Sequence, residues 1–180
     1  MLKRLNGQND KKLVLLVSLG KEYHINKSFK ICNMGKLSKI YEVEVVYKRP
    51  EITSMPVVKN CEDIVLVFKE LISEAKIDLK EFFLLALLTR NNRVLGVSIL
   101  SVGNSNCTTI SAKEILQLAI KTNSSAIIMC HNHPSGNLEP SKCDIDMTRR
   151  IKEICEICDI TLLDHIIITS EGHSSFIEQV

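Results

Sequence analysis

The sequence from Ala126 to Asp144 reads AIIMCHNHPSGNLEPSKCD. It begins with an apolar run that ends at Cys130, which is typical of a buried strand. Turn residues follow this run, and then comes Ser141-Lys142-Cys143-Asp144, the pattern of a capping box that begins a helix. A strand, a loop and a helix are therefore predicted, with two histidines at the point where the strand ends.

The segments on either side carry the patterns of further strands and helices. Asn60 has the pattern of an N-cap before one helix, and Ser111-Ala112-Lys113-Glu114 has that of a second capping box. Strands are predicted over residues 82–88, 94–100 and 161–169. The apolar residues at helical spacing, which we expect to face the core, are Ile64, Val67, Phe68, Leu71, Ile72 and Ala75 in the first helix, Ile115, Leu118 and Ala119 in the second, and Ile145, Thr148, Ile151, Cys155 and Cys158 in the third. This order predicts an α/β domain whose mixed sheet is covered by helices on both faces.

Charge separates the beginning of the chain from the rest. Residues 1–50 contain 11 Lys and Arg against 4 Asp and Glu, whereas residues 51–180 contain 12 against 17. Two prolines bracket a polar stretch over residues 50–56, which indicates a boundary. We expect a basic N-terminal arm with short strands over residues 1–50 and a zinc-binding domain over residues 51–180, with its core at about 60–180. The arm could contact nucleic acid, but it lacks an arginine cluster and an aromatic stacking platform, so a solvated arm is favoured.

Length and composition exclude several classes of protein. The 180 residues, 45% hydrophobic and 24% charged, are typical of one globular domain with an arm. The longest apolar run has seven residues, far fewer than the ~18 that span a bilayer, which excludes an integral membrane protein. Seven cysteines, an odd number spread over apolar segments, do not form the framework of a secreted disulfide-rich protein. We therefore expect a cytoplasmic protein with reduced thiols and no membrane partner.

Three side chains of the quoted sequence have the chemistry of metal ligands. His131 and His133 are two residues apart at the end of a strand, so their side chains point to the same side. Asp144 follows in the first turn of the next helix. Two histidines and one carboxylate with an open fourth position are typical of a catalytic zinc site, where the metal lowers the pKa of a bound water toward ~7. We expect one zinc per chain, although Asp144 could also serve only as a helix cap.

The spacing His-x-His, seven residues, Ser, two residues, Asp resembles the JAMM motif of the JAB/MPN metallopeptidase-like family. The sequence over residues 131–136, with Leu162-Leu163-Asp164-His165 and Asn92-Arg93-Val94-Leu95-Gly96, is similar to the RadC branch of that family. The resemblance extends from about Tyr41 to the C-terminus. It implies a cytidine-deaminase-like fold of three layers, a zinc ion held by His131, His133 and Asp144, and a role for Ser141 in stabilising an oxyanion.

The resemblance also implies a glutamate on an earlier strand, which accepts the proton of the zinc water and passes it to the leaving amine. In RadC-like sequences we expect it shortly after Val94-Leu95-Gly96, but residues 91–113 contain no Asp or Glu. Ile99 occupies the expected position, or Ser98 if the register shifts by one. Neither side chain can act as a general base, so Glu139 or a substrate carboxylate would have to replace it.

Two functions therefore remain open. The first is a zinc metallopeptidase-like hydrolase of peptide or isopeptide bonds, in which Ser141 stabilises the oxyanion. The second is a zinc-stabilised pseudoenzyme or binding module with a protein or DNA partner, since RadC proteins carry a historical DNA-repair label. The complete ligand set favours the enzyme, and the missing glutamate favours the binding module.

Other histidines and cysteines have simpler interpretations. Cys155-x-x-Cys158 lies on the apolar side of a predicted helix, which favours a core role over a redox or zinc pair. His165 lies among strand residues and is expected to be structural or to support a ligand, while His173 lies in a turn. A zinc nucleobase deaminase would need His-x-Glu, and Asn132 stands in the place of that glutamate.

Overall fold

The computed structural model describes residues 47–72, 74–103 and 110–180, together with four short strands within residues 14–41. The chain forms two compact units, Met1–Lys48 and Arg49–Val180. In the first unit, β1 (Val14–Val17) pairs with β2 (Lys21–His24), and β3 (Ser28–Phe29) pairs with β4 (Ile40–Tyr41), both antiparallel.

The second unit is built on a five-stranded mixed sheet with the order β6-β5-β7-β8-β9. Its strands are β5 (Glu81–Leu88), β6 (Val94–Gly103), β7 (Ala126–Asn132), β8 (Thr161–Ile168) and β9 (His173–Ser175). β5 runs antiparallel to both β6 and β7, β7 is parallel to β8, and β9 returns antiparallel to β8. The expected mixed sheet is therefore confirmed.

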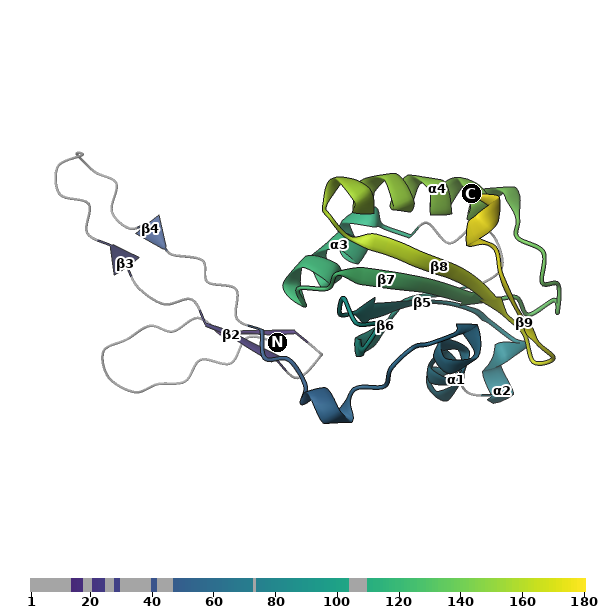
Figure 1. Ribbon diagram of the computed structural model, residues 1–180, viewed down its shortest axis with the longest axis horizontal. Helices are drawn as coiled ribbons and strands as arrows, with labels where there is room; N and C mark the ends of the chain where they lie inside the picture. Colours follow the sequence, from purple (N-terminus) through teal and green to yellow (C-terminus); the bar gives the residue numbers. More distant parts are fainter. Residues whose placement is uncertain are drawn as a thin grey trace. The chain divides into compact units, whose positions relative to one another are not determined.

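Helices cover both faces of this sheet (Figure 1). One face packs against α1 (Cys61–Leu71) and the short α2 (Glu74–Ile77), and the other packs against α3 (Ala112–Lys121) and α4 (Lys142–Ile157). Two 3₁₀ turns, Ile52–Ser54 and Ile177–Gln179, complete the unit. None of the helices in the described part of the chain has the length and apolar character needed to cross a membrane.

Two hydrophobic clusters form the core, one on each face of the sheet. Phe68 and Leu84 belong to the cluster beneath α1, whereas Phe83 and Ile151 belong to the cluster beneath α3 and α4. All of β7 and nearly all of β5 are buried, because the central strands are enclosed from both sides. The continuous apolar runs in the sequence are explained by this position in the sheet.

Two sequence-based expectations about helices are wrong. The first predicted helix does not continue to Ala75, because α1 ends at Leu71, Ile72 is extended, and α2 begins at Glu74. Ala75 is exposed as a result, and Ile72 is buried. Leu71, the last residue of α1, is exposed as well and does not face the core as expected. Ser111 is the N-cap of α3, but its side chain makes no capping hydrogen bond. Ser111 is exposed, so water can satisfy the free N–H groups there.

Five of the seven cysteines lie in the described residues. Cys61, Cys130, Cys155 and Cys158 are free, and Cys155 is completely buried. Burial, helped by the neighbouring Cys158, raises the pKa of Cys155 to about 11. Little reactive thiolate therefore forms at neutral pH, in agreement with a core role. Cys143 is disulfide-bonded, and it lies exposed at the start of α4. The expectation of reduced thiols is wrong for this residue.

Asn132 connects the end of β7 to the segment that leads into β5. Its side chain is completely buried and points away from the histidines on either side of it. The Oδ1 atom accepts a hydrogen bond from the Phe82 N–H at 2.7 Å, and Nδ2 donates to the carbonyl oxygens of Ile77 at 2.6 Å and Lys80 at 2.8 Å. These three bonds hold the first residues of β5 beside the last residues of β7.

We predict that Asn132→Ala lowers the free energy of unfolding by about 2–4 kcal/mol, because it leaves buried backbone groups without partners. Urea denaturation with a metal chelator present measures this effect without a contribution from bound metal. Asn60→Ala is the matched control, since Asn60 caps α1 with one exposed hydrogen bond, and its loss should cost about 1 kcal/mol. Equal losses in the two variants would contradict a special role for the buried amide.

Candidate metal centre

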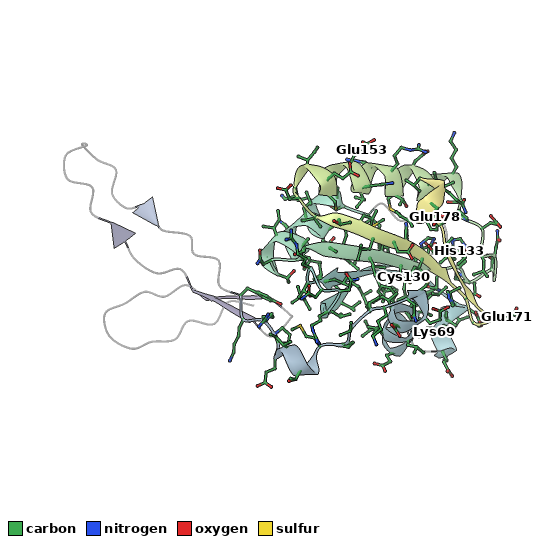
Figure 2. The ribbon with its side chains drawn as sticks, viewed as in Figure 1. Lys69, Cys130, His133, Glu153, Glu171 and Glu178 are labelled. Atoms are coloured by element: carbon green, nitrogen blue, oxygen red, sulfur yellow. The ribbon has the colours of Figure 1, made fainter. Side chains whose placement is uncertain are left out.

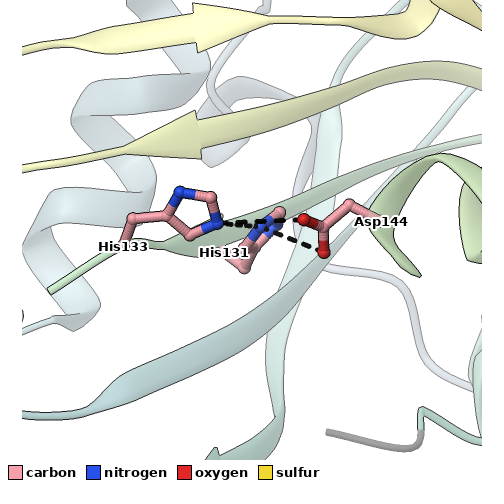
Figure 3. A group of neighbouring side chains, drawn as sticks. All are labelled: His131, His133 and Asp144. Atoms are coloured by element: carbon pink, nitrogen blue, oxygen red, sulfur yellow. Dashed lines mark hydrogen bonds and ion pairs between the residues drawn. The ribbon is translucent and has the colours of Figure 1, made fainter. Parts of the chain in front are cut away.

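The structure brings together the three predicted metal ligands. His131 comes from the end of β7, His133 follows this strand, and Asp144 lies in the first turn of α4. The two Nε2 atoms are 2.9 Å apart. The carboxylate lies 3.4 Å from His131 Nε2 through Oδ1 and 3.9 Å from His133 Nε2 through Oδ2 (Figure 3). One ligand atom from each residue therefore faces a common point.

A hydrogen bond to the loop orients the ring of His133. Its Nδ1 lies 2.6 Å from the carbonyl oxygen of Asn137, which can only accept, so Nδ1 carries the proton. In the neutral ring Nε2 then keeps its lone pair, directed at His131 and Asp144. Gly136 makes this turn possible with a φ of 78°, a value that glycine adopts without steric cost. Figure 2 labels His133, which comes just after the end of β7, and Cys130, which lies within this strand.

Asp144 is held by the capping box that the sequence predicts. Its Oδ2 accepts from the N–H of Ser141 at 2.8 Å and from the Ser141 hydroxyl at 2.5 Å, while its own N–H donates to Ser141 Oγ at 3.2 Å. Burial alone would raise the pKa of Asp144, but the neighbouring His131 and the hydrogen bonds from Ser141 outweigh burial and lower the pKa. The carboxylate is therefore ionised at neutral pH.

This donor set fits a divalent metal ion. Zinc takes imidazole nitrogen and carboxylate oxygen ligands at about 2.0–2.2 Å. The lone pair of His133 and the ionised carboxylate of Asp144 point toward the second imidazole, that of His131. A cation between them would satisfy all three groups at once.

A pocket of about 830 Å³ opens beside these ligands. His133, Asp144 and Ser141 lie on its wall, together with apolar residues that include Phe83, Met147 and Ile151. Apolar surface with a few polar groups at one end is typical of a site that binds a small ligand or a segment of a larger one.

Glu81 also lines this pocket, although the sequence analysis did not name it. It is the first residue of β5, and the pairing of β5 with β7 sets Phe83 opposite His131. Because side chains alternate along a strand, Glu81 lies two residues earlier on the same face as Phe83, and it lines the same pocket as His133. The available signal was a glutamate directly before the apolar run of β5.

Ile99 and Ser98 lie elsewhere in the sheet. Ile99 pairs with Leu84, which packs beneath α1 on the face opposite the metal centre, and Ser98 pairs with Leu85. Neither lines the pocket, so the structure does not bring the expected glutamate position to the site. Glu139, the other carboxylate considered, is exposed on the pocket wall.

His165 contacts the candidate ligand His131, whereas His173 is outside the ligand group and lies in β9 rather than in the expected turn. The completely buried His165 has its Nε2 atom 3.0 Å from His131 Nδ1. Burial lowers the pKa of His165 well below its usual value, and the neighbouring His131 adds to this effect. His165 is therefore neutral at physiological pH.

The fold and the site together define a three-layer α/β domain with a candidate His-His-Asp metal centre at the end of a central strand. Residues 58–180 match the family described as "RadC-like JAB domain", and the chain belongs to this family. The expected RadC-like JAB/MPN membership is thus confirmed.

Curated relatives support the same assignment. A UPF0758 protein of Desulfitobacterium hafniense is 41% identical over 125 residues, which cover 69% of this chain and 53% of that protein. A UPF0758 protein of Coprothermobacter proteolyticus is 44% identical over 96 residues, which cover 53% of this chain and 41% of that protein. One from Geotalea uraniireducens is 38% identical over 113 residues, covering 63% and 50% respectively. The chain matches about half the length of these relatives.

We predict that Asp144→Ala has two separable costs. In the presence of a chelator, loss of the cap should lower the free energy of unfolding by about 1 kcal/mol, and without chelator the loss of bound metal should add to it. Asp63→Ala is the matched control, because Asp63 accepts a hydrogen bond from the Lys59 N–H at the start of α1, away from the metal centre. Melting curves with and without chelator measure both. Identical metal dependence in the two variants would contradict the assignment of Asp144 as a ligand.

Proposed function

We propose that the protein is a zinc-dependent hydrolase of peptide or isopeptide bonds, with Glu81 as its general base. The observation that carries this proposal is the position of Glu81. Glu81 lines the same pocket as His133 and Asp144. A proton acceptor beside the metal ligands is what hydrolysis by an activated water requires.

The metal ligands are His131, His133 and Asp144, and we propose one zinc ion per chain. When bound, zinc would polarise a substrate carbonyl and make a water molecule more acidic. Glu81 accepts the proton of the attacking water and donates it to the leaving amine. The carboxylate therefore acts first as a base and then as an acid.

Ser141 is proposed to stabilise the oxyanion. In the structure its hydroxyl donates to Asp144 Oδ2, so it must turn toward the substrate oxygen to serve this purpose. The backbone N–H of Ser141 also donates to Oδ2, at 2.8 Å. This second bond keeps Asp144 in place while the hydroxyl turns, so the two tasks of Ser141 are compatible.

A peptide or protein substrate fits the proposed chemistry best. The pocket combines apolar residues such as Phe83 and Met147 with the polar groups at the metal centre, and a peptide segment presents both kinds of group. Glu81 supplies the carboxylate whose apparent absence was the reason to consider a pseudoenzyme or binding module. A solvated basic arm and a cytoplasmic location both stay predictions.

We predict that the purified protein binds about one zinc per chain and that His133→Ala does not. The substitution removes one of three ligands, so the remaining pair should not retain the ion through gel filtration. Elemental analysis of the eluted protein measures the ratio. His173→Ala is the control, since His173 lies in β9 outside the ligand group. Full zinc occupancy in His133→Ala would refute the proposed site.

We predict that Glu81→Gln lowers the rate of peptide or isopeptide hydrolysis by about 10²- to 10⁴-fold, the usual contribution of a general base. Zinc content should stay at the level of the unsubstituted protein. Glu139→Gln is the matched control and should keep most of the activity. Ile99→Glu added to Glu81→Gln should not restore activity, because residue 99 faces the side of α1. Single-turnover rates on a panel of peptides measure the effect of each substitution. Loss of activity in Glu139→Gln, but not in Glu81→Gln, would identify Glu139 as the general base instead.

A further inference from the structure

Behind the candidate metal centre, a chain of hydrogen bonds runs from α4 through β8 to β7. Thr148 donates its hydroxyl proton to the carbonyl oxygen of Asp144 at 2.5 Å. Thr148 Oγ1 also lies 2.6 Å from His165 Nδ1, and His165 Nε2 lies 3.0 Å from His131 Nδ1. Thr148, His165 and His131 are 0 or 1% exposed, so water does not take the place of these partners.

The protons in this chain can be assigned from its first link. A backbone carbonyl can only accept, so the single hydroxyl proton of Thr148 is used on Asp144. The contact with His165 must then be donated by Nδ1 of the ring. A neutral imidazole has one N–H, so His165 Nε2 is an acceptor, and His131 Nδ1 must carry the proton between them. His131 Nε2 is left with a lone pair on the side of the metal ligands.

The surroundings of His165 keep this assignment unique. A His165 imidazolium would have two N–H groups and could donate from Nε2 to His131 Nδ1. This would reverse the direction of the hydrogen bond between the two rings. His165 is completely buried, and its ring lies 5.5 Å from that of Phe83 and 4.5 Å from that of Phe176, measured between centroids. An ion surrounded by such apolar groups is strongly disfavoured, so the neutral ring prevails.

We infer that Thr148 and His165 are positioning residues that hold His131 in the one tautomer able to bind a metal through Nε2. The inference rests on the proposed metal site and adds two residues that do not touch the ion. Without the Thr148 hydroxyl, the Nδ1–H group of His165 has no acceptor in this series of hydrogen bonds. The ring can then carry its proton on Nε2 and donate to His131 Nδ1, which moves the proton of His131 to Nε2. In that state the ligand atom is blocked.

The decisive experiment compares Thr148→Val with Thr148→Ser. Valine keeps the shape of threonine without its hydroxyl, whereas serine keeps the hydroxyl. Zinc affinity is measured by competition with a chromogenic chelator at neutral pH. Thr148→Val should bind zinc about 10- to 100-fold more weakly, the usual effect of losing a partner behind a ligand. Thr148→Ser should restore the affinity of the unsubstituted protein.

The tautomer itself gives a second readout, which a merely structural role for Thr148 would not change. In the metal-free protein labelled with ¹⁵N-histidine, NMR shifts should show Nδ1 of His131 protonated in the unsubstituted protein and in Thr148→Ser. The proton should move at least partly to Nε2 in Thr148→Val.

The outcomes separate this inference from the proposed function. If the unsubstituted protein binds no zinc, the metal site is refuted and the inference with it. If zinc binds but Thr148→Val has the same affinity and the same tautomer, only the inference is overturned. If Thr148→Val does not fold, His165→Gln and His165→Leu decide, since the glutamine amide can accept from His131 and donate to Thr148. Higher zinc affinity in His165→Gln supports the inference, and equal affinities overturn it.

Discussion

Strand β7 has a helical layer on each of its faces, so its successive side chains must enter opposite cores. This alternation sends His131 toward α4 and Asn132 toward α1 and α2, and the two residues have different tasks as a result. The histidine meets the carboxylate of Asp144, whereas the amide holds the backbone that leads into β5. One strand end therefore sets the position of the metal ligands and that of the neighbouring Glu81. The parallel pairing with β8 adds His165 behind the same point.

The sequence was sufficient for those features that depend on neighbours along the chain. The capping box of Ser141 and Asp144 forms as predicted, because its two residues are three positions apart and need only a helix between them. The buried strands were recognisable from continuous apolar runs, which require cover on both sides. Local signals were weaker at Ser111 and at residue 72. At Ser111, the surrounding packing decides whether water or the side chain satisfies the first N–H groups of α3. At residue 72, it decides whether the helix continues or ends.

Register between strands explains why the sequence alone does not predict a carboxylate beside the candidate metal ligands. Glu81 shares a pocket with His133 because β5 and β7 pair with Phe83 opposite His131, and this pairing joins two strands that are far apart in the sequence. The pairing of β5 with β6 is regular from Gly96 to Ile99, but the face that Ile99 occupies depends on its partner Leu84, which packs beneath α1. A shift of one residue turns a side chain to the other face of a sheet. The tautomer chain through Thr148 and His165 likewise depends on contacts between distant segments.

The two oxygen atoms of the Asp144 carboxylate have different partners, which leaves one of them directed at the candidate metal position. Oδ2 is held by Ser141, whereas Oδ1 faces His131. Folding of α4 already fixes the rotamer of the carboxylate, so an arriving ion has little conformational entropy to remove from this ligand. An ion can depart for the same reason without fraying the helix. The capping box therefore preorganises this carboxylate before any metal ion arrives, in contrast to small zinc domains whose ligands come together only when the metal binds.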